Sequence, residues 1–310
     1  MLIILSSLAL DIIYPYHSGI LYRIHVVHTS YMMALRLFKK APRTKLHGLL
    51  IWLFTVVSHI GLYIIVLYAS SMVHRILWLI ASIYVLKNSI SLKLLLNHVR
   101  GVEECLKENN LECAKRNVSG IVRRRVDDLG SGHVASAALE SLYESLVDGF
   151  TSPLLYYVFL GPLGSLLQRI INTLDSALGY KEPEYREVGW FSAKADTIIN
   201  YVPARLTAFI EILTCPLIKG SLLEAFKIYN RDKDATESMN AGHPMAAASG
   251  CLRVKLEKIS SYTIGREYDL PKWKDLHSGI IHAILITVIF LLIVFILIIA
   301  IQHLLSIVIK

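Results

Sequence analysis

Three acidic side chains recur at four-residue intervals near the middle of the chain, in a stretch whose composition favours a helix. They are Glu140, Glu144 and Asp148. At about 100° per residue, this spacing places the three carboxylates on one face of a helix, within about 80° of arc. Like charges in this register repel, so the face predicts a bound cation, either magnesium or a substrate ammonium group. A solvated acidic helix side is the alternative, and spacing alone favours it because such helices are common.

A second polar set interrupts an otherwise apolar region, residues 150–227, which prolines and glycines break into short pieces. Broken helices at membrane depth are tolerated where they line a cavity, so this region is expected to form the wall of a site. Carboxylates and carboxamides bind hard cations, and lysine and arginine neutralise phosphate, so the set has the chemistry of a nucleotide-handling site. Hydrogen-bonded polar groups inside a helix bundle are the alternative, and spacing does not decide between the two. The set comprises Asn172, Asp175, Lys181, Asp196, Asn200 and Arg205.

Weaker signals come from an arginine run and a histidine pair. Arg123, Arg124 and Arg125 form either a phosphate clamp or, more commonly, a solvated or lipid-headgroup face. His25 and His28 have the spacing of a weak metal pair, but packing or substrate polarity is the favoured interpretation.

Several familiar motifs do not occur in the sequence, which narrows the classes of site. There is no G-x-x-x-x-G-K-[ST] phosphate loop, no glycine-rich dinucleotide fingerprint, no H-E-x-x-H and no G-x-S-x-G. Four cysteines lack the close pairs of a zinc site or a redox motif, so we expect them to be reduced and inert. They are Cys105, Cys113, Cys215 and Cys251.

The elements that must position these residues are membrane helices. Hydrophobic residues make up 54% of the 310, only 18% are charged, and the mean hydropathy of +0.51 is too high for an ordinary soluble chain. Residues 48–69 and 283–301 contain no Asp, Glu, Lys or Arg, and at about 1.5 Å per residue they cross a hydrocarbon core of about 30 Å. We therefore predict an all-α polytopic integral membrane protein with about four to six membrane helices, some broken or re-entrant, and cytoplasmic helical segments.

The predicted organisation is a single membrane-embedded domain over residues 1–310. Membrane segments are expected at about 1–22, 48–69, 76–96 and 280–309, re-entrant or spanning helices at 150–168 and 203–218, and polar segments at 97–149 and 230–277. The segment 76–96 spans only if Lys87 and Lys93 face protein or reach the interface.

Much of the net charge of +8 is local. A cluster of Lys and Arg lies between positions 36 and 45, and the positive-inside rule places this loop in the cytoplasm. That orientation puts the N-terminus outside and residues 97–149 inside, in a multi-pass protein of the cell membrane. Nucleic-acid binding is the rival explanation of the charge, but no aromatic-interleaved basic strand or recognition helix accompanies the cluster.

Longer blocks of sequence carry more information than these spacings. They are E-S-L-Y-E-S-L-V-D-G-F-T-S-P-L at 140–154, N-T-L-D-S-A-L-G-Y-K at 172–181, A-K-A-D-T-I-I-N-Y-V-P-A-R-L at 193–206 and S-M-N-A-G-H-P at 238–244. In this order they resemble blocks of the adenosylcobinamide-phosphate synthase family of cobalamin biosynthesis. Asp11, His17, residues 25–27 and residues 91–93 are similar to further elements of that family. The resemblance extends to about residue 265.

The chain also departs from the family pattern at four positions. Val26 and Met239 stand where the family usually has proline, and Arg125 and Thr197 stand where it usually has aspartate. A mechanism for this chain therefore cannot use carboxylates at positions 125 and 197.

The resemblance implies a membrane ligase that uses ATP to join an amino-alcohol phosphate, such as aminopropanol phosphate, to adenosylcobyric acid, giving adenosylcobinamide phosphate. A carboxylate is a poor acceptor, so ATP is expected to convert it to an acyl phosphate that the amine attacks, with magnesium offsetting the phosphate charge. The expected partners are the corrinoid, the amino-alcohol phosphate, the lipid bilayer and other membrane enzymes of late cobalamin assembly, and no nucleic acid.

These implications assign roles to the polar residues. Metal ligands or the catalytic base are expected among Glu140, Glu144, Asp148, Asp175 and Asp196, with the first four as magnesium ligands. Phosphate contacts are expected from Arg124, Lys181 and Arg205, and contacts that orient the substrate from Asn172, Asn200, Asn240 and His25. The acidic face is expected to point into the same cavity as Asp175 and Asp196.

Two other classes of membrane protein remain as alternatives. A transporter, or a non-catalytic membrane partner of the corrinoid pathway, shares the membrane setting, but the sequence has no internal repeat of the kind that transporters show. A CDP-alcohol phosphotransferase shares the Asp148-Gly149 pair but needs further aspartates after it, and residues 150–167 contain no acidic residue.

Overall fold

The computed structural model describes residues 1–308, and most of them are α-helical. The chain divides into two compact units: unit 1 comprises Met1–Ser91 and Asp148–Asn200, and unit 2 comprises Leu92–Val147 and Tyr201–Lys310. Each unit therefore contains two separate stretches of chain.

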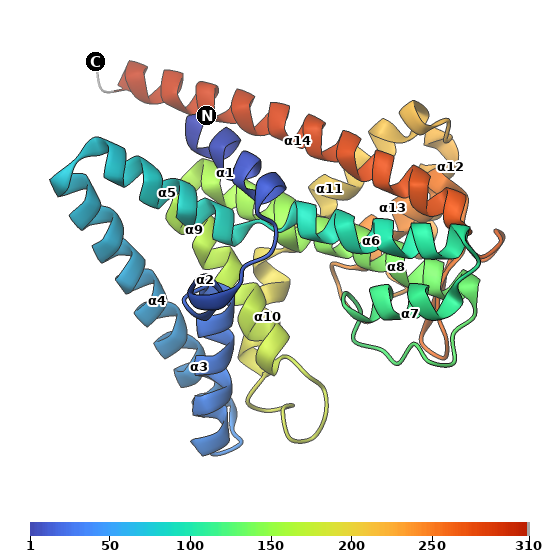
Figure 1. Ribbon diagram of the computed structural model, residues 1–310, viewed down its shortest axis with the longest axis horizontal. Coiled ribbons are helices and arrows are strands. Elements are labelled where there is room, and N and C mark those ends of the chain that lie inside the picture. The colour runs from blue at the N-terminus through green and yellow to red at the C-terminus, as the bar shows by residue number, and fades with distance from the viewer. Residues whose placement is uncertain (309–310) are drawn as a thin grey trace. The chain divides into compact units, whose positions relative to one another are not determined.

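Unit 1 is built from helices alone in the described residues. Its elements are α1 (Leu2–Ile13), α2 (Gly19–Arg23), α3 (Val26–Lys40), α4 (Lys45–Val73), α5 (Arg75–Ser89), a π-helical segment η1 (Val147–Thr151) at the unit boundary, α9 (Ser152–Leu178) and α10 (Trp190–Ile199). Helix α9 is central because it packs against α3, α4, α5 and α10, and Figure 1 shows α3 and α4 side by side as a hairpin.

The core of unit 1 follows from the apolar spacing of α9. Leu166, Ile170, Leu174 and Leu178 recur every four residues, so they form one stripe, and all four are buried. The stripe packs against buried side chains of α3 and α4, including Phe38. The face of α9 next to this stripe carries the polar residues described below.

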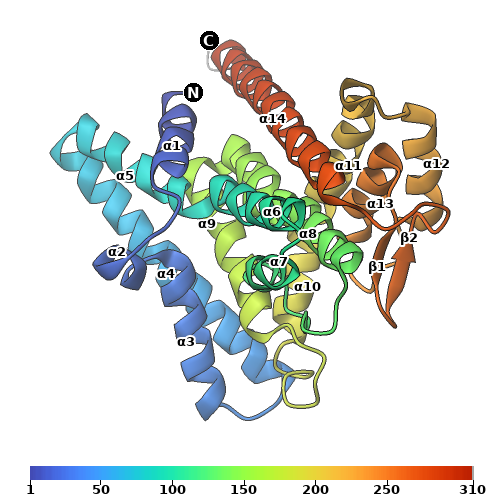
Figure 2. The same ribbon diagram turned by 45° about the vertical axis from the view of Figure 1, so that its right-hand side comes forward.

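Unit 2 combines helices with one short hairpin. Its elements are α6 (Leu92–Lys107), α7 (Leu111–Ser119), α8 (Ser131–Leu146), α11 (Tyr201–Thr214), the 3-10 helix η2 (Cys215–Ile218), α12 (Leu222–Asp232), α13 (Gly242–Leu252), β1 (Leu256–Lys258), β2 (Tyr262–Ile264) and α14 (Trp273–Val308). The two antiparallel strands pair Glu257 with Thr263, and they lie near α13 in Figure 2.

The all-α, polytopic prediction is confirmed. Five helical stretches are long and apolar enough to cross a membrane: Lys45–Val73, Arg75–Lys107, Ser131–Leu178, Tyr201–Ile218 and Trp273–Ile307. The expected break near 150–168 lies at Gly161, where φ of 61° and ψ of −151° interrupt the helix just before Pro162. Only glycine adopts this conformation readily, and the proline cannot donate the next helical hydrogen bond.

The predicted N-terminal membrane segment is divided in the structure. Helix α1 has 12 residues and ends before Pro15, and α2 starts at Gly19. A helix of this length extends only about 18 Å, less than a hydrocarbon core of about 30 Å, so α1 is shorter than the five candidate spans.

The expectation of four reduced cysteines is wrong. Disulfides join Cys105 to Cys113 and Cys215 to Cys251, with Cα atoms 5.6 Å and 5.2 Å apart, and no cysteine is free. Both bridges lie in unit 2, where one joins α6 to α7 across 8 positions of sequence and the other joins η2 to α13 across 36. The linear spacing of cysteines does not reveal such a pairing.

Candidate active site

Two carboxylates of unit 1 share one carboxamide. Asp148 lies in η1, Asn172 in α9 and Asp196 in α10. The Nδ2 atom of Asn172 donates to Asp148 Oδ2 at 3.0 Å and to Asp196 Oδ1 at 3.1 Å. The structure thus brings together three residues that sequence analysis assigned to the site from three different blocks.

Asn200 orients the carboxylate of Asp196. It caps the C-terminus of α10 and is 1% exposed, and its Nδ2 donates to Asp196 Oδ1 at 2.9 Å. Its Oδ1 accepts from Ser152 Oγ at 2.6 Å and from Gln168 Nε2 at 3.1 Å. Asn200 is therefore held within the protein as a positioning residue, and the four-residue spacing from Asp196 places both on one helix face.

Asp196 keeps one oxygen available. The Nδ2 atoms of Asn172 and Asn200 both donate to Oδ1, and Oδ2 accepts no hydrogen bond from the part of unit 1 that the structure describes. Burial raises the pKa of Asp196, and this effect outweighs the hydrogen bonds from Asn172 and Asn200, which lower it. A carboxylate with a raised pKa and a free oxygen can take a proton from an ammonium group.

Thr197 occupies the position where the family has a second aspartate. Its hydroxyl donates to the carbonyl oxygen of Ala193 at 2.8 Å, within α10. The acid pair of the unit 1 cluster is therefore formed by Asp148 and Asp196 rather than by two adjacent aspartates.

The Asp-Gly pair lies in a π-helical turn, a local geometry that is frequent at functional sites. The Gly149 carbonyl accepts from the backbone N–H of Ser91 at 3.0 Å. A Cβ atom on Gly149 would lie 2.7 Å from Ser91 Oγ, so glycine is needed for this approach. Residues 91–93 and 140–154, two elements of the family resemblance, thus meet at this contact.

Sequence analysis missed Arg169, which lies in α9 one turn before Asn172. Its Nε and Nη2 atoms both donate to the Ser89 carbonyl, at 2.9 Å and 2.6 Å, and Nη2 also approaches Ser91 Oγ at 3.4 Å. An arginine directly after the predicted helix at 150–168, and before the N-T-L-D-S block, is a signal that could have identified it.

A buried ion pair in the same unit was also missed. Lys87 Nζ of α5 lies 3.6 Å from Asp11 Oδ1 of α1, and the two side chains are 7% and 2% exposed. Lys87 thus faces protein, as a span over residues 76–96 requires of it, whereas the same requirement on Lys93 stays a prediction.

His25 is a neutral helix cap in this structure. It precedes α3, and its Nδ1 accepts from the Val27 N–H at 3.2 Å. Burial, and then the positive charges of His17, Lys87 and Arg169, lower the pKa of His25 to about 3. The ring of His28 lies against Tyr22, which supports packing rather than a metal pair.

Asp175 and Lys181 belong to the end of α9. A Cβ atom on Gly179 would lie 1.9 Å from Asp175 Oδ1, so the carboxylate lies over this glycine, and the D-x-x-x-G spacing of the block has a steric reason. Lys181 is exposed in the loop that follows. Their roles with metal and phosphate stay predictions.

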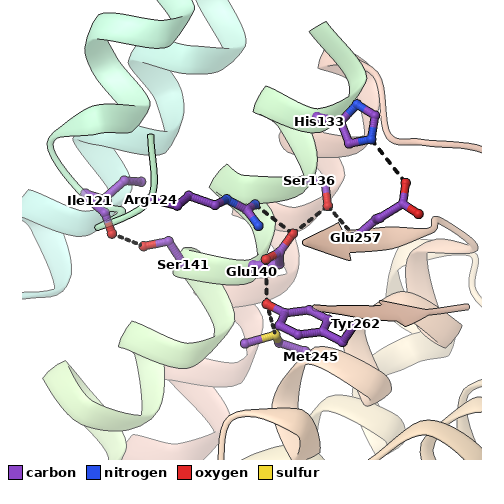
Figure 3. A network of polar contacts seen from close by, with 9 residues as sticks. All are labelled: Ile121, Arg124, His133, Ser136, Glu140, Ser141, Met245, Glu257 and Tyr262. Atoms are coloured by element: carbon purple, nitrogen blue, oxygen red, sulfur yellow. Dashed lines mark hydrogen bonds and ion pairs between the residues drawn. The ribbon is translucent and has the colours of Figure 1, made fainter. Parts of the chain in front are cut away.

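Glu140 belongs to a different polar network, in unit 2, which Figure 3 shows. Arg124 Nη2 and Ser136 Oγ donate to Glu140 Oε1 at 3.1 Å and 2.6 Å, and Tyr262 Oη donates to Oε2 at 2.6 Å. Ser136 Oγ in turn accepts from the Glu257 N–H at 2.8 Å. The carboxylate, which is 5% exposed, thus joins α8 to the strand hairpin and to Arg124.

This network pairs two predicted site residues with each other, because Arg124, expected as a phosphate contact, forms an ion pair with Glu140. Glu144 lies one turn further along α8 and is exposed. Glu140 and Glu144 belong to unit 2, whereas Asp148, Asp175 and Asp196 belong to unit 1. A cavity shared by all five stays a prediction.

Arg205 and Asn240 meet in unit 2. Arg205 Nη1 donates to the Tyr201 carbonyl at 2.8 Å and to Asn240 Oδ1 at 3.2 Å, and the guanidinium lies 3.4 Å from the centroid of the Tyr201 ring. These partners are all neutral. Nearby, His243 contacts Tyr229 Oη at 2.8 Å, and burial and the charge of Arg205 lower the pKa of His243 to about 4.

The magnesium ligands assigned from the sequence stay predictions. Across residues 1–308, no three His, Cys, Asp or Glu side chains lie close enough together to hold a metal ion. Magnesium is usually held by one or two carboxylates together with substrate phosphates and water. Asp148 with the neighbouring Asn172 Oδ1 provides such a partial set.

Comparison with known proteins agrees with the resemblance seen in the sequence blocks. The family model described as CobD/Cbib protein matches residues 4–279. The chain belongs to this family. A probable cobalamin biosynthesis protein CobD of Aeropyrum pernix is 46% identical over 269 residues, covering 87% of this chain and 84% of that protein.

Two further relatives extend the comparison. A probable cobalamin biosynthesis protein CobD of Thermoplasma acidophilum is 38% identical over 216 residues, which is 69% of each chain. A cobalamin biosynthesis protein CobD of Clostridium perfringens is 33% identical over 227 residues, covering 73% of this chain and 71% of that protein. No solved structure matches the chain.

Proposed function

We propose that this chain is an ATP-dependent amide ligase of cobalamin biosynthesis, which joins an amino-alcohol phosphate to adenosylcobyric acid in the cell membrane. Membership of the CobD/Cbib family and the names of its relatives support the pathway. The Asp148–Asn172–Asp196 cluster is the observation that carries the reaction, because it combines a free carboxylate oxygen with fixed neighbours.

Amide formation requires that the incoming ammonium group lose a proton before nitrogen can attack. Asp196 accepts this proton on Oδ2, while Asn172 and Asn200 hold Oδ1 in place. Asp148, on the other side of Asn172, attracts the ammonium group toward the same point. The cluster thus binds the amine and prepares it for attack.

The acceptor needs activation because a carboxylate resists attack by an amine. The corrinoid carboxylate takes the γ-phosphoryl group of ATP with release of ADP, and the amine then displaces phosphate to form the amide. Lys181 of unit 1 and Arg205 of unit 2 are each proposed to contact phosphate. Magnesium, when bound, would supply charge neutralisation for these phosphates, and Asp175 is the proposed carboxylate ligand apart from the ammonium site.

The proposed reaction is tested with protein purified in detergent. Adenosylcobyric acid, aminopropanol phosphate, ATP and magnesium are supplied, and adenosylcobinamide phosphate is measured by chromatography and mass spectrometry. Product that depends on both ATP and the amine is the expected result. Folded protein that forms no product, yet restores the reaction when a second membrane protein of the pathway is added, would instead make the chain a non-catalytic partner.

A further inference from the structure

Arg169 is rigidly placed in unit 1. It lies in α9, within the candidate span Ser131–Leu178, and two of its nitrogens are used by the Ser89 carbonyl. The third contact, with Ser91 Oγ, depends on the missing side chain of Gly149, since a Cβ there would lie 2.7 Å from that oxygen. The guanidinium plane is therefore fixed before any ligand arrives.

Arg169 forms no direct ion pair with a carboxylate in the part of unit 1 that the structure describes. Its protein partners are a carbonyl and a hydroxyl, and no ion pair joins it to the described carboxylates of unit 1. Asp148 and Asp11 are the carboxylates whose charges act on Arg169, but neither contacts its guanidinium directly, and Asp11 pairs with Lys87. A guanidinium that no carboxylate contacts directly can still accept an anionic ligand, provided that the ligand also suits the nearby acids.

One part of the guanidinium is left for that ligand. Nε and Nη2 make the contacts above, whereas Nη1 donates to no group in the part of unit 1 that the structure describes. A fixed guanidinium with a free N–H edge suits phosphate oxygens, with which arginine makes strong, charge-assisted hydrogen bonds.

The neighbours of Arg169 favour a ligand that carries both signs of charge. Asn172 follows Arg169 by three residues, so the two side chains lie on one face of α9 with Cβ atoms about 5–6 Å apart. Asn172 holds the carboxylates of Asp148 and Asp196. A simple anion at Arg169 would be repelled by Asp148, whereas a ligand with an ammonium group next to its phosphate would satisfy both ends.

We propose that Arg169 binds the phosphate of a short amino-alcohol phosphate whose ammonium group lies toward Asp148 and Asp196. The assignment rests on the proposed function for the identity of the amine, but not for the binding itself. It distinguishes the phosphate of the amine substrate, which Arg169 binds, from the phosphates of ATP, which other cations contact.

Binding of small probes to the purified protein tests this assignment without ATP or corrinoid. O-phosphoethanolamine, ethanolamine and inorganic phosphate are titrated by calorimetry. Wild type should bind O-phosphoethanolamine more tightly than either fragment. Arg169→Gln should weaken that binding about 10-fold to 100-fold, the usual loss for a charge-assisted hydrogen bond to phosphate. Arg43→Gln, an arginine of the same unit outside the cluster, should leave it unchanged.

Two controls keep the result decisive. Arg169→Lys retains the charge without the planar fork and should bind with intermediate affinity, so it replaces Arg169→Gln if the latter fails to fold. Asp196→Asn should weaken O-phosphoethanolamine but not inorganic phosphate. Equal affinity of folded wild type and Arg169 variants for O-phosphoethanolamine would overturn the assignment. Normal binding without ligase activity would instead count against the proposed function alone.

Discussion

The carboxylates of the two units differ in how far the protein satisfies them. Glu140 in unit 2 receives donors on both oxygens, from Arg124 and Ser136 on one and from Tyr262 on the other. Asp196 in unit 1 receives two donors on a single oxygen and keeps the other for a ligand. A carboxylate whose oxygens are all used within the protein stabilises the fold, whereas one that is only oriented is available for chemistry.

The largest expected effect is on the rate of the unit 1 variant. Asp196→Asn removes the proposed base while keeping the shape of the side chain and its contacts with neighbouring amides. We expect the coupling rate to fall about 100-fold to 10,000-fold, the usual contribution of a general base, with little change in melting temperature. Coupling assays and thermal unfolding on the same detergent samples measure both. If Asp196→Asn couples at a rate close to that of wild type, Asp196 is not the base, and it does not differ from Glu140 in the way proposed.

The unit 2 network should show the opposite pattern. Glu140→Ala leaves Arg124 and Tyr262 without their acceptor in a mostly buried setting, which costs about 3–5 kcal/mol of unfolding free energy. The rate per folded molecule should stay near that of wild type. Glu112→Ala, which breaks an exposed ion pair with Lys115, is the matched control and should cost less than about 1 kcal/mol. If Glu140→Ala is stable but slow, Glu140 acts in catalysis as first predicted.

Sequence reasoning identified the membrane class and most members of the unit 1 cluster, because apolar runs and ordered blocks are local features. It could not separate Glu140 from Asp148, which share one helical register, because the partners that satisfy Glu140 come from residues 124 and 262. Arg169 was missed for a related reason. Its block was recognised from Asn172 onward, and the contact with Ser89 joins residues 80 positions apart. The disulfides likewise depend on tertiary packing.

A smaller effect is expected where two sequence elements touch. Gly149→Ala places a Cβ atom 2.7 Å from Ser91 Oγ and 3.7 Å from Arg169 Nη2, so the serine must move and the arginine loses a contact. We expect the coupling rate to fall about 10-fold, mainly through a higher KM for the amine, because a misplaced binding group costs affinity. The double variant Gly149→Ala, Ser91→Ala removes the clash and should recover part of the loss. If the KM for the amine is unchanged in Gly149→Ala, Gly149 does not contribute to binding of the amine.

The smallest expected effect concerns pH and arises in unit 1 from His25. Its folded-state pKa of about 3 lies below the ordinary value of 6.5, so the folded protein binds fewer protons than the unfolded chain between these values. The stability that comes from keeping His25 neutral is complete above pH 6.5 and is lost progressively as pH falls toward 3. At about pH 5 the loss in unfolding free energy is about 2 kcal/mol. His243 in unit 2, with a pKa of about 4, adds a slope of the same sign, and Asp196, whose pKa is raised, adds one of the opposite sign. His25→Asn keeps a good helix cap but removes the titration, so its melting temperature should fall less than that of wild type on acidification. If the melting temperatures of wild type and His25→Asn fall by the same amount between about pH 7 and about pH 5, His25 is not held neutral by the fold.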